Sequence, residues 1–226
     1  MVEQISNWVN ISFFLIYLIT VFLFYYLNDK PKKVISFIFI WSILHSILAL
    51  NSFYFLDETS TFNNFVFILV PAFVLIFYGA LSSKGKQFYE NRNVFISPIL
   101  HIIRVPVEIV LYYLAVKNLL PAEMTFEGRN FDIIAGITAP IICVVSIYFS
   151  LNKRILLIWN LCCLGLIFFI LVNGILSSEI TYKQFGFSQA NKAIMYFPYI
   201  LLPAVIVPIV IYTHITDIIL LSKKES

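Results

Sequence analysis

Seven long runs of apolar residues, separated by short polar segments, constrain this chain more than any other feature of its sequence. Each run has 18 residues or more, enough for an α-helix to cross a hydrocarbon core about 30 Å thick. The apolar positions are consecutive rather than alternating, which favours helices over barrel strands. The sequence therefore predicts an all-α polytopic membrane protein: a seven-transmembrane-helix bundle forming a single domain over residues 1–226. The expected spans are about 8–27, 34–56, 64–81, 94–116, 132–151, 155–176 and 195–221.

The composition of the chain also points to lipid as its main solvent. Hydrophobic residues make up 61% of the chain and charged residues 12%, whereas a soluble domain is about a quarter charged. A soluble chain of this size has too little interior to bury so much apolar surface. The net charge of +3 arises mainly in short loops. We therefore expect the lipid bilayer, and no nucleic acid, as a partner.

The distribution of lysine and arginine predicts the orientation of the bundle. With seven spans, the first, third and fifth loops and the C-terminal tail share one side and carry ten basic residues, against four on the other side. Basic loops stay in the cytoplasm, so the N-terminus is predicted outside and the C-terminus in the cytoplasm. The segment before the first run has no basic residue, and no small-residue cleavage site follows the run. We expect that run to be retained as a membrane helix.

A polar stripe lies within the fourth apolar run and is the main candidate for a functional site. Ser97, His101, Arg104, Glu108 and Tyr112 fall within about 60° of one another at about 100° per residue. A charged side chain at the bilayer centre costs about 2.5–3.5 kcal/mol on insertion scales, so such residues face the bundle interior. Arg104 and Glu108 are spaced to pair within one helix. The stripe is either a ligand- or proton-handling site or a neutralised pair that joins helices.

Further polar residues in the second and seventh runs are expected near this stripe. His45 lies in the second run, and His214 and Asp217 lie in the seventh. Counting residues from the cytoplasmic ends places His101 and His214 about 10 Å inside the inner boundary. We predict that the second, fourth and seventh helices line one cavity, although for His45 an interhelical hydrogen bond is the alternative. The candidate ligand-binding or proton-handling residues are His101, Arg104, Glu108, Tyr112, His45, His214 and Asp217.

The seventh run also contains three evenly spaced prolines, Pro198, Pro203 and Pro208. Proline removes a backbone donor and clashes with the preceding turn, so this helix is predicted to be kinked or interrupted. A broken helix at membrane depth can line or gate a cavity, although prolines are also common in membrane helices.

Three functions remain open on these residues. The first is binding or transport of a small, for example anionic, ligand or of protons, with Arg104 contacting a carboxylate through two hydrogen bonds. The second is a membrane-embedded enzyme or redox protein that binds zinc or haem through His45, His101 and His214. The third is a non-catalytic scaffold for partner subunits. The sequence has no familiar catalytic motif, and a retinal Schiff base is excluded because no lysine lies between Lys192 and Lys223.

Three stretches of the chain, residues 104–112, 124–132 and 196–210, resemble an uncharacterised family of bacterial seven-helix integral membrane proteins. The similarity covers most of the chain from about residue 99 onward. The resemblance implies a multi-pass location in the bacterial inner membrane. It implies no functional residue and no cofactor.

Overall fold

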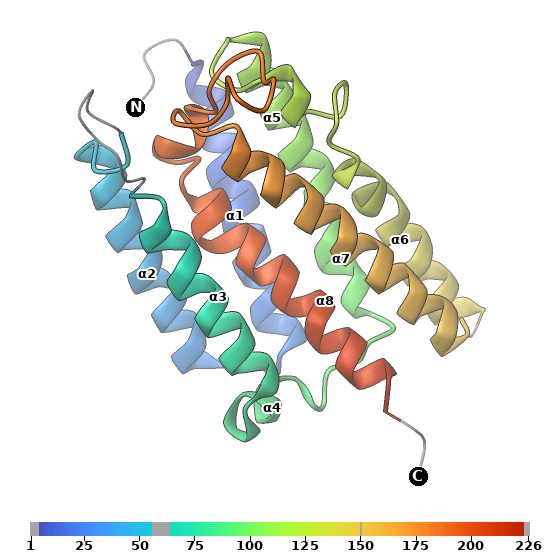
Figure 1. Cartoon of the computed structure of the whole chain (residues 1–226). Coiled ribbons are helices and arrows are strands. Elements are labelled where there is room, and N and C mark those ends of the chain that lie inside the picture. Colours follow the sequence, from blue (N-terminus) through green and yellow to red (C-terminus); the bar gives the residue numbers. More distant parts are fainter. Residues whose placement is uncertain (1–4, 56–63, 150, 224–226) are drawn as a thin grey trace.

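The computed structural model describes residues 5–55, 64–149 and 151–223. In these residues the chain is all-α and contains no strand (Figure 1). The α-helices are α1 (Asn7–Leu27), α2 (Lys32–Leu50), α3 (Val66–Leu81), α4 (Ser83–Tyr89), α5 (Arg104–Val116), α6 (Asp132–Tyr148), α7 (Lys153–Leu176) and α8 (Val207–Leu221). The shorter helical turns are η1 (Ser97–Ile103), η2 (Ala122–Met124), η3 (Ala193–Met195) and the π-helical η4 (Leu202–Ile206).

Each of the seven predicted apolar runs contains an α-helix. Five helical segments are long and apolar enough to cross a membrane: α1, α2, η1 with α5, α7, and η4 with α8. The pair α3 and α4, bent by 80°, would make a sixth, and α6 has only 17 residues. These helices are compatible with a membrane protein. The polar segment after α3, predicted as a loop, contains the additional helix α4.

The second helix ends earlier than predicted, at Leu50 rather than at residue 56. The reason is a Schellman-type stop, in which the N–H of Phe53 donates to the carbonyl of Leu48 and the N–H of Ser52 to that of Ala49. Ser52 has the left-handed conformation that this motif requires, with φ of 60°. The turn brings Tyr54 back against α2. Residue 56 lies outside the described residues.

The start of the seventh span is interrupted, in agreement with its prolines. Residues 197–200 form turns, and a π-helical turn then leads into α8. Pro208 has no N–H to donate to the carbonyl of Ala204 four residues earlier. That carbonyl instead accepts a hydrogen bond from Nε1 of Trp41 on α2, at 3.1 Å. Pro208 thereby leaves the Ala204 carbonyl free to accept the hydrogen bond that attaches α2 to the bundle.

The seventh span is the centre of the bundle. In the most apolar 18-residue stretch of this span, 61% of the residues are buried. In the corresponding stretch of α2 only 17% are buried, so α2 lies at the periphery. Helix α8 packs against both α3 and α7, and α6 packs on η1 and α5 (Figure 1). The beginning of α1 and the end of α8 lie at opposite ends of the bundle (Figure 1).

Candidate functional site

Arg104 forms an ion pair with Asp132 of the neighbouring helix. Its Nε lies 3.3 Å from Oδ2 of Asp132, and both side chains are buried. The two residues are the first of α5 and α6, and these helices approach closely because Gly136 faces Val105. A Cβ on Gly136 would lie 2.8 Å from Cγ2 of Val105. The pairing within one helix that the sequence spacing suggested, with Glu108, is replaced by a pair between helices.

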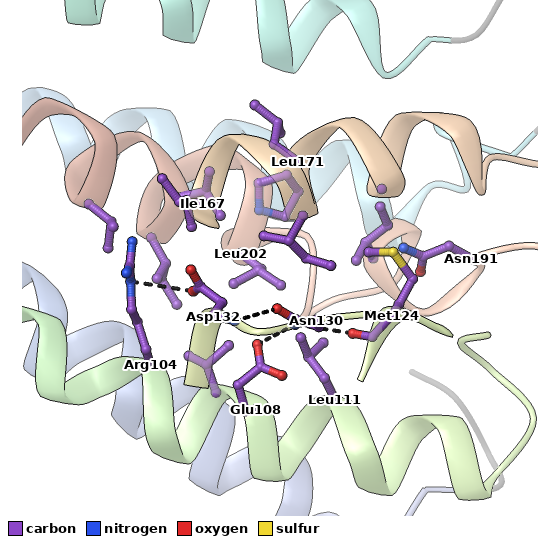
Figure 2. Close-up of a pocket in the computed structure, with 18 of the residues that line it drawn as sticks. Arg104, Glu108, Leu111, Met124, Asn130, Asp132, Ile167, Leu171, Asn191 and Leu202 are labelled. Atoms are coloured by element: carbon purple, nitrogen blue, oxygen red, sulfur yellow. Dashed lines mark hydrogen bonds and ion pairs between the residues drawn. The ribbon is translucent and has the colours of Figure 1, made fainter. Parts of the chain in front are cut away.

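Glu108 is held by Asn130, which lies just before α6. Nδ2 of Asn130 donates to Oε1 of Glu108 at 2.6 Å and to the carbonyl of Met124 at 3.2 Å. Oδ1 of Asn130 accepts a hydrogen bond from the N–H of Asp132 at 3.0 Å. Asn130 therefore connects both carboxyl-bearing residues to the loop that precedes α6 (Figure 2).

These residues line one end of a cavity of about 90 Å³, whose other walls are apolar (Figure 2). The walls come from α5, α7, η4 and α8, with Leu111, Ile167, Leu171 and Leu202 among the lining side chains. Five buried polar atoms of lining residues have no hydrogen-bond partner in the described part of the chain. They are Arg104 Nε, which is ion-paired but not hydrogen-bonded, Arg104 Nη1, Glu108 Oε2, Asp132 Oδ1 and Asn191 Oδ1. Because buried polar groups are usually paired, the cavity has unused hydrogen-bonding capacity, most of it at the end formed by Arg104, Glu108 and Asp132.

A second cavity of about 100 Å³ adjoins the first and shares Phe65, Leu69, Ile175 and Asn191 with it. It extends toward Ser178, just after α7, and toward the loops at that end of the bundle. The second cavity therefore continues the first past Asn191, between residues of α3 and α7.

Two loops bond to each other over this end of the bundle. The carboxylate of Glu123 accepts hydrogen bonds from the N–H and the hydroxyl of Ser188, at 3.0 and 2.9 Å. Gln189 donates to the carbonyl of Leu120 at 2.6 Å. Partial burial opposes ionisation of Glu123, but backbone hydrogen bonds, the Ser188 hydroxyl and the charge of Arg129 outweigh it, so the pKa of Glu123 is lowered.

His101 and His214, predicted to be companions, lie against each other. Their rings stack with centroids 3.8 Å apart and planes 6° apart, and both side chains are completely buried. Nδ1 of His214 is 2.8 Å from Oδ1 of Asn160, and the ring of Trp159 packs on both imidazoles. Both nitrogens of His101 and Nε2 of His214 have no hydrogen-bond partner among the described residues. Neither histidine lines the cavity of about 90 Å³ beside Arg104, which we call the Arg104 cavity.

Asp217 is paired with Arg92, a residue that the sequence places in a loop. Nη2 of Arg92 lies 2.9 Å from Oδ1 of Asp217, and its Nε donates to the same oxygen at 3.0 Å. The guanidinium also donates to Oδ1 of Asn28 at 3.1 Å and to the hydroxyl of Thr216. Arg92 thus joins the end of α1 to α8 near the end of the bundle where α8 finishes.

The remaining two predicted site residues lie elsewhere. His45 bonds through Nδ1 to the hydroxyl of Tyr54, and its ring centroid is 4.1 Å from that of Trp41. Tyr112 packs on Phe126, with centroids 5.1 Å apart. Helix α2 contributes no residue to the Arg104 cavity, which differs from the prediction that the second helix forms one of its walls.

The three histidines do not converge as a ligand set for zinc or haem. His101 stacks on His214, whereas His45 is engaged with Tyr54. Across residues 5–55, 64–149 and 151–223, no group of three or more His, Cys, Asp or Glu side chains is arranged to hold a metal ion.

The sequence reasoning missed several residues of these clusters, namely Arg92, Asn130, Asp132, Asn160 and Asn191. Arg92 and Asp132 sit at the ends of apolar runs, where charged residues are common at membrane boundaries. Asn160 lies well inside a predicted span, and its polar amide within an apolar helix was an available clue.

A family model described as a domain of unknown function (DUF8737) matches residues 61–222, and the chain belongs to this family. No curated protein and no solved structure gives a significant match. The family assignment agrees with the resemblance to an uncharacterised family.

Proposed function

We propose that this member of the DUF8737 family is a protein of the bacterial inner membrane that crosses the bilayer seven times, with its N-terminus outside. The charge asymmetry of ten basic residues against four supports this orientation. Helices α3 and α6, with 16 and 17 residues, are about 24–26 Å long at about 1.5 Å per residue. They lie near the lower limit for a spanning helix, and α4 extends the third span along the membrane surface.

The Arg104 cavity binds, in this proposal, a small ligand with a positively charged or hydrogen-bond-donating group. The observation that carries the proposal is its set of unpartnered atoms: three acceptors, on Glu108, Asp132 and Asn191, against two donor nitrogens that both belong to Arg104. One guanidinium faces two carboxyl groups, so a cationic group or a proton balances the site. An anionic ligand, expected from the sequence, is less favoured because Asp132 already pairs with Arg104.

The rest of the cavity suits a short aliphatic body. Its walls are formed by leucine, isoleucine and valine side chains around a volume of about 90 Å³. This volume corresponds to about three water molecules at about 30 Å³ each, so the ligand has only a few non-hydrogen atoms within it. A small amine with a short alkyl chain fits both the charge and the volume.

Thermal unfolding of the purified protein with two size-matched probes tests this proposal. We expect n-butylammonium to raise the Tm, by about 2–4 °C for each kcal/mol of binding free energy, and butanoate to have no effect. Glu108→Gln and Asp132→Asn should remove the increase, whereas Glu127→Gln, at an exposed loop position, should preserve it. Equal stabilisation by butanoate, or an increase that survives both cavity substitutions, would contradict the proposal.

A second candidate, proton transfer, is favoured by the buried histidine pair. His101 lies three residues before Arg104 and His214 three residues before Asp217, and three of their ring nitrogens have no partner among the described residues. Neutral imidazoles can accept and release protons. In proteoliposomes containing a pH-sensitive dye, proton uptake that is lost in His101→Gln would support this function, and a flux equal to that of empty vesicles would exclude it.

A further inference from the structure

A groove of about 360 Å³ lies between α2 and α3, on the other side of the seventh span from the Arg104 cavity. Phe37 and Trp41 form its α2 side, Ile76 its α3 side, and Val205 and Ile209 its floor. From Lys33 to Trp41 it follows α2 for about 12 Å at about 1.5 Å per residue. The groove is thus elongated and almost entirely apolar.

The groove stays open because small residues line it and because α2 packs on α1 and η4 rather than closely on α3. Ala72, Gly79 and Ala204 all line the groove. The hydrogen bond from Trp41 to the Ala204 carbonyl fixes the middle of α2 above η4. The described side chains leave this space between the two helices unfilled, so it is suited to a flexible chain from the surrounding lipid.

One end of the groove is basic. Lys33 at the start of α2 and Lys84 of α4 are both exposed and both line this end. Helix α4 turns by 80° from α3, which carries Lys84 and Phe88 across the end of the groove. The turn is tight: Ser82 caps the N–H of Gly85 at 3.0 Å, and Gly85 packs against the backbone of Gly79 without room for a Cβ. Among the residues that the structure describes, no aspartate or glutamate lines the groove.

We propose that this groove binds an anionic phospholipid, with its phosphate between Lys33 and Lys84 and one acyl chain along α2. Two lysines without a lining carboxylate complement a net negative headgroup, and the apolar groove gives an acyl chain a surface that a soluble phosphate does not use. The basic end is the cytoplasmic end in the proposed orientation, so the lipid belongs to the cytoplasmic leaflet. The site uses none of the residues of the Arg104 cavity that carry its charge.

In this proposal the lipid contacts the seventh span, which forms one wall of the groove and one wall of the Arg104 cavity. Val205 and Ile209 line the groove, whereas Ile206 and Val210, on the other face of the same span, line the Arg104 cavity. An acyl chain in the groove therefore supports the segment around Pro208, where the regular helical hydrogen bond to Ala204 is missing.

Native mass spectrometry of the full chain in detergent tests the headgroup contact, with phosphatidylglycerol and phosphatidylcholine of identical acyl chains as probes. We expect tighter binding of phosphatidylglycerol, and a loss of about 25-fold in the double variant Lys33→Gln/Lys84→Gln, at about fivefold per lysine. The matched control is Lys32→Gln/Lys86→Gln, whose lysines do not line the groove and whose removal should leave binding within about twofold. Equal binding of the two lipids, or equal effects of the two double variants, would overturn the proposal.

A second pair of variants tests the acyl-chain contact. Leu75 lines the groove and is 43% exposed, whereas its neighbour Val74 is 61% exposed and does not line it. Leu75→Trp should fill the groove and reduce phosphatidylglycerol binding, and Val74→Trp should not. Displacement of the lipid by an equal concentration of glycerol 3-phosphate would show a site for the anion alone and would also overturn the proposal. Asp132→Asn should bind phosphatidylglycerol as the unchanged protein does, which separates this result from that of the cavity.

Discussion

Replacement of Arg104 by methionine tests the ion pair at the centre of the candidate site. Arg104 and Asp132 have side chains that are 2% and 6% exposed, so Arg104→Met leaves a buried carboxylate without its counter-charge. Breaking one side of a buried ion pair costs about 3–5 kcal/mol, mainly because the remaining charge is stranded. We expect the free energy of unfolding to fall by this amount.

The second substitution identifies the partner. Asp132→Asn added to Arg104→Met removes the stranded charge and should restore about 2 kcal/mol, since the penalty of a buried ion is several kcal/mol. Glu108→Gln added to Arg104→Met should restore less, because Oε1 of Glu108 is held by Asn130 and Asp132 remains stranded. Alone, Glu108→Gln should change stability by less than about 1 kcal/mol, because glutamine retains the oxygen that accepts from Asn130.

The assay is unfolding of the purified protein by increasing SDS in a mild detergent, followed by far-ultraviolet circular dichroism. The double-variant comparison isolates the interaction between two positions. Two results would show that Arg104 and Asp132 do not form a stabilising buried ion pair. One is a loss of less than about 1 kcal/mol in Arg104→Met, and the other is equal rescue by Glu108→Gln and Asp132→Asn.

Three further predictions concern other parts of the bundle. Gly136→Ala should destabilise the protein by about 1–3 kcal/mol through overpacking against α5, whereas Gly165→Ala, with nothing within 4 Å of its Cβ, should be neutral or slightly stabilising in the same SDS assay. Arg92→Met should lower stability by about 3–5 kcal/mol, since it removes every hydrogen bond that this guanidinium makes to α1 and α8; a loss under about 1 kcal/mol would contradict its structural role. Because the pKa of Glu123 is lowered from 4.5 on folding, its contribution is present above pH 4.5 and is lost as the pH falls through the lower folded value. Hydrogen exchange around Ser188, corrected for intrinsic rates, should therefore accelerate at acidic pH relative to Glu123→Gln, and identical pH profiles for the two proteins would exclude this linkage.

Hydropathy alone was sufficient to place a helix in every apolar run, because the cost of unpaired backbone groups in lipid leaves helices as the main solution. It was less accurate at helix ends. The end of α2 at Leu50 depends on the left-handed conformation of Ser52. This position is usually occupied by glycine or asparagine, so a serine there does not predict the end of a helix. Helix α4 was missed because it is only seven residues long and most of its residues, in the sequence SKGKQFY, are not apolar.

The contacts between helices in the candidate site could not be predicted from the sequence. The spacing of Arg104 and Glu108 was compatible with a pair inside one helix, but the preferred partner, Asp132, begins the next span and is brought close by Gly136. His101 and His214, which residue counts placed at the same level, stack on each other. His45 was expected near the same polar stripe, yet α2 lies at the periphery. The level of a residue along its helix follows from the rise per residue. Which helices are neighbours depends on which faces pack together, and that cannot be read from one sequence.

A crystal structure of the protein with an anomalously scattering amine, 2-(methylseleno)ethylammonium, tests directly whether the Arg104 cavity binds a small cation. We expect one selenium peak inside the cavity between α5 and α7, near Ile167 and Leu171, with the ammonium group directed toward Glu108 and Asp132. The peak should be absent from crystals of Asp132→Asn grown with the same amine. A peak in the groove between α2 and α3 alone, or no selenium peak in the Arg104 cavity, would contradict the assignment of that cavity as a binding site for a small cation.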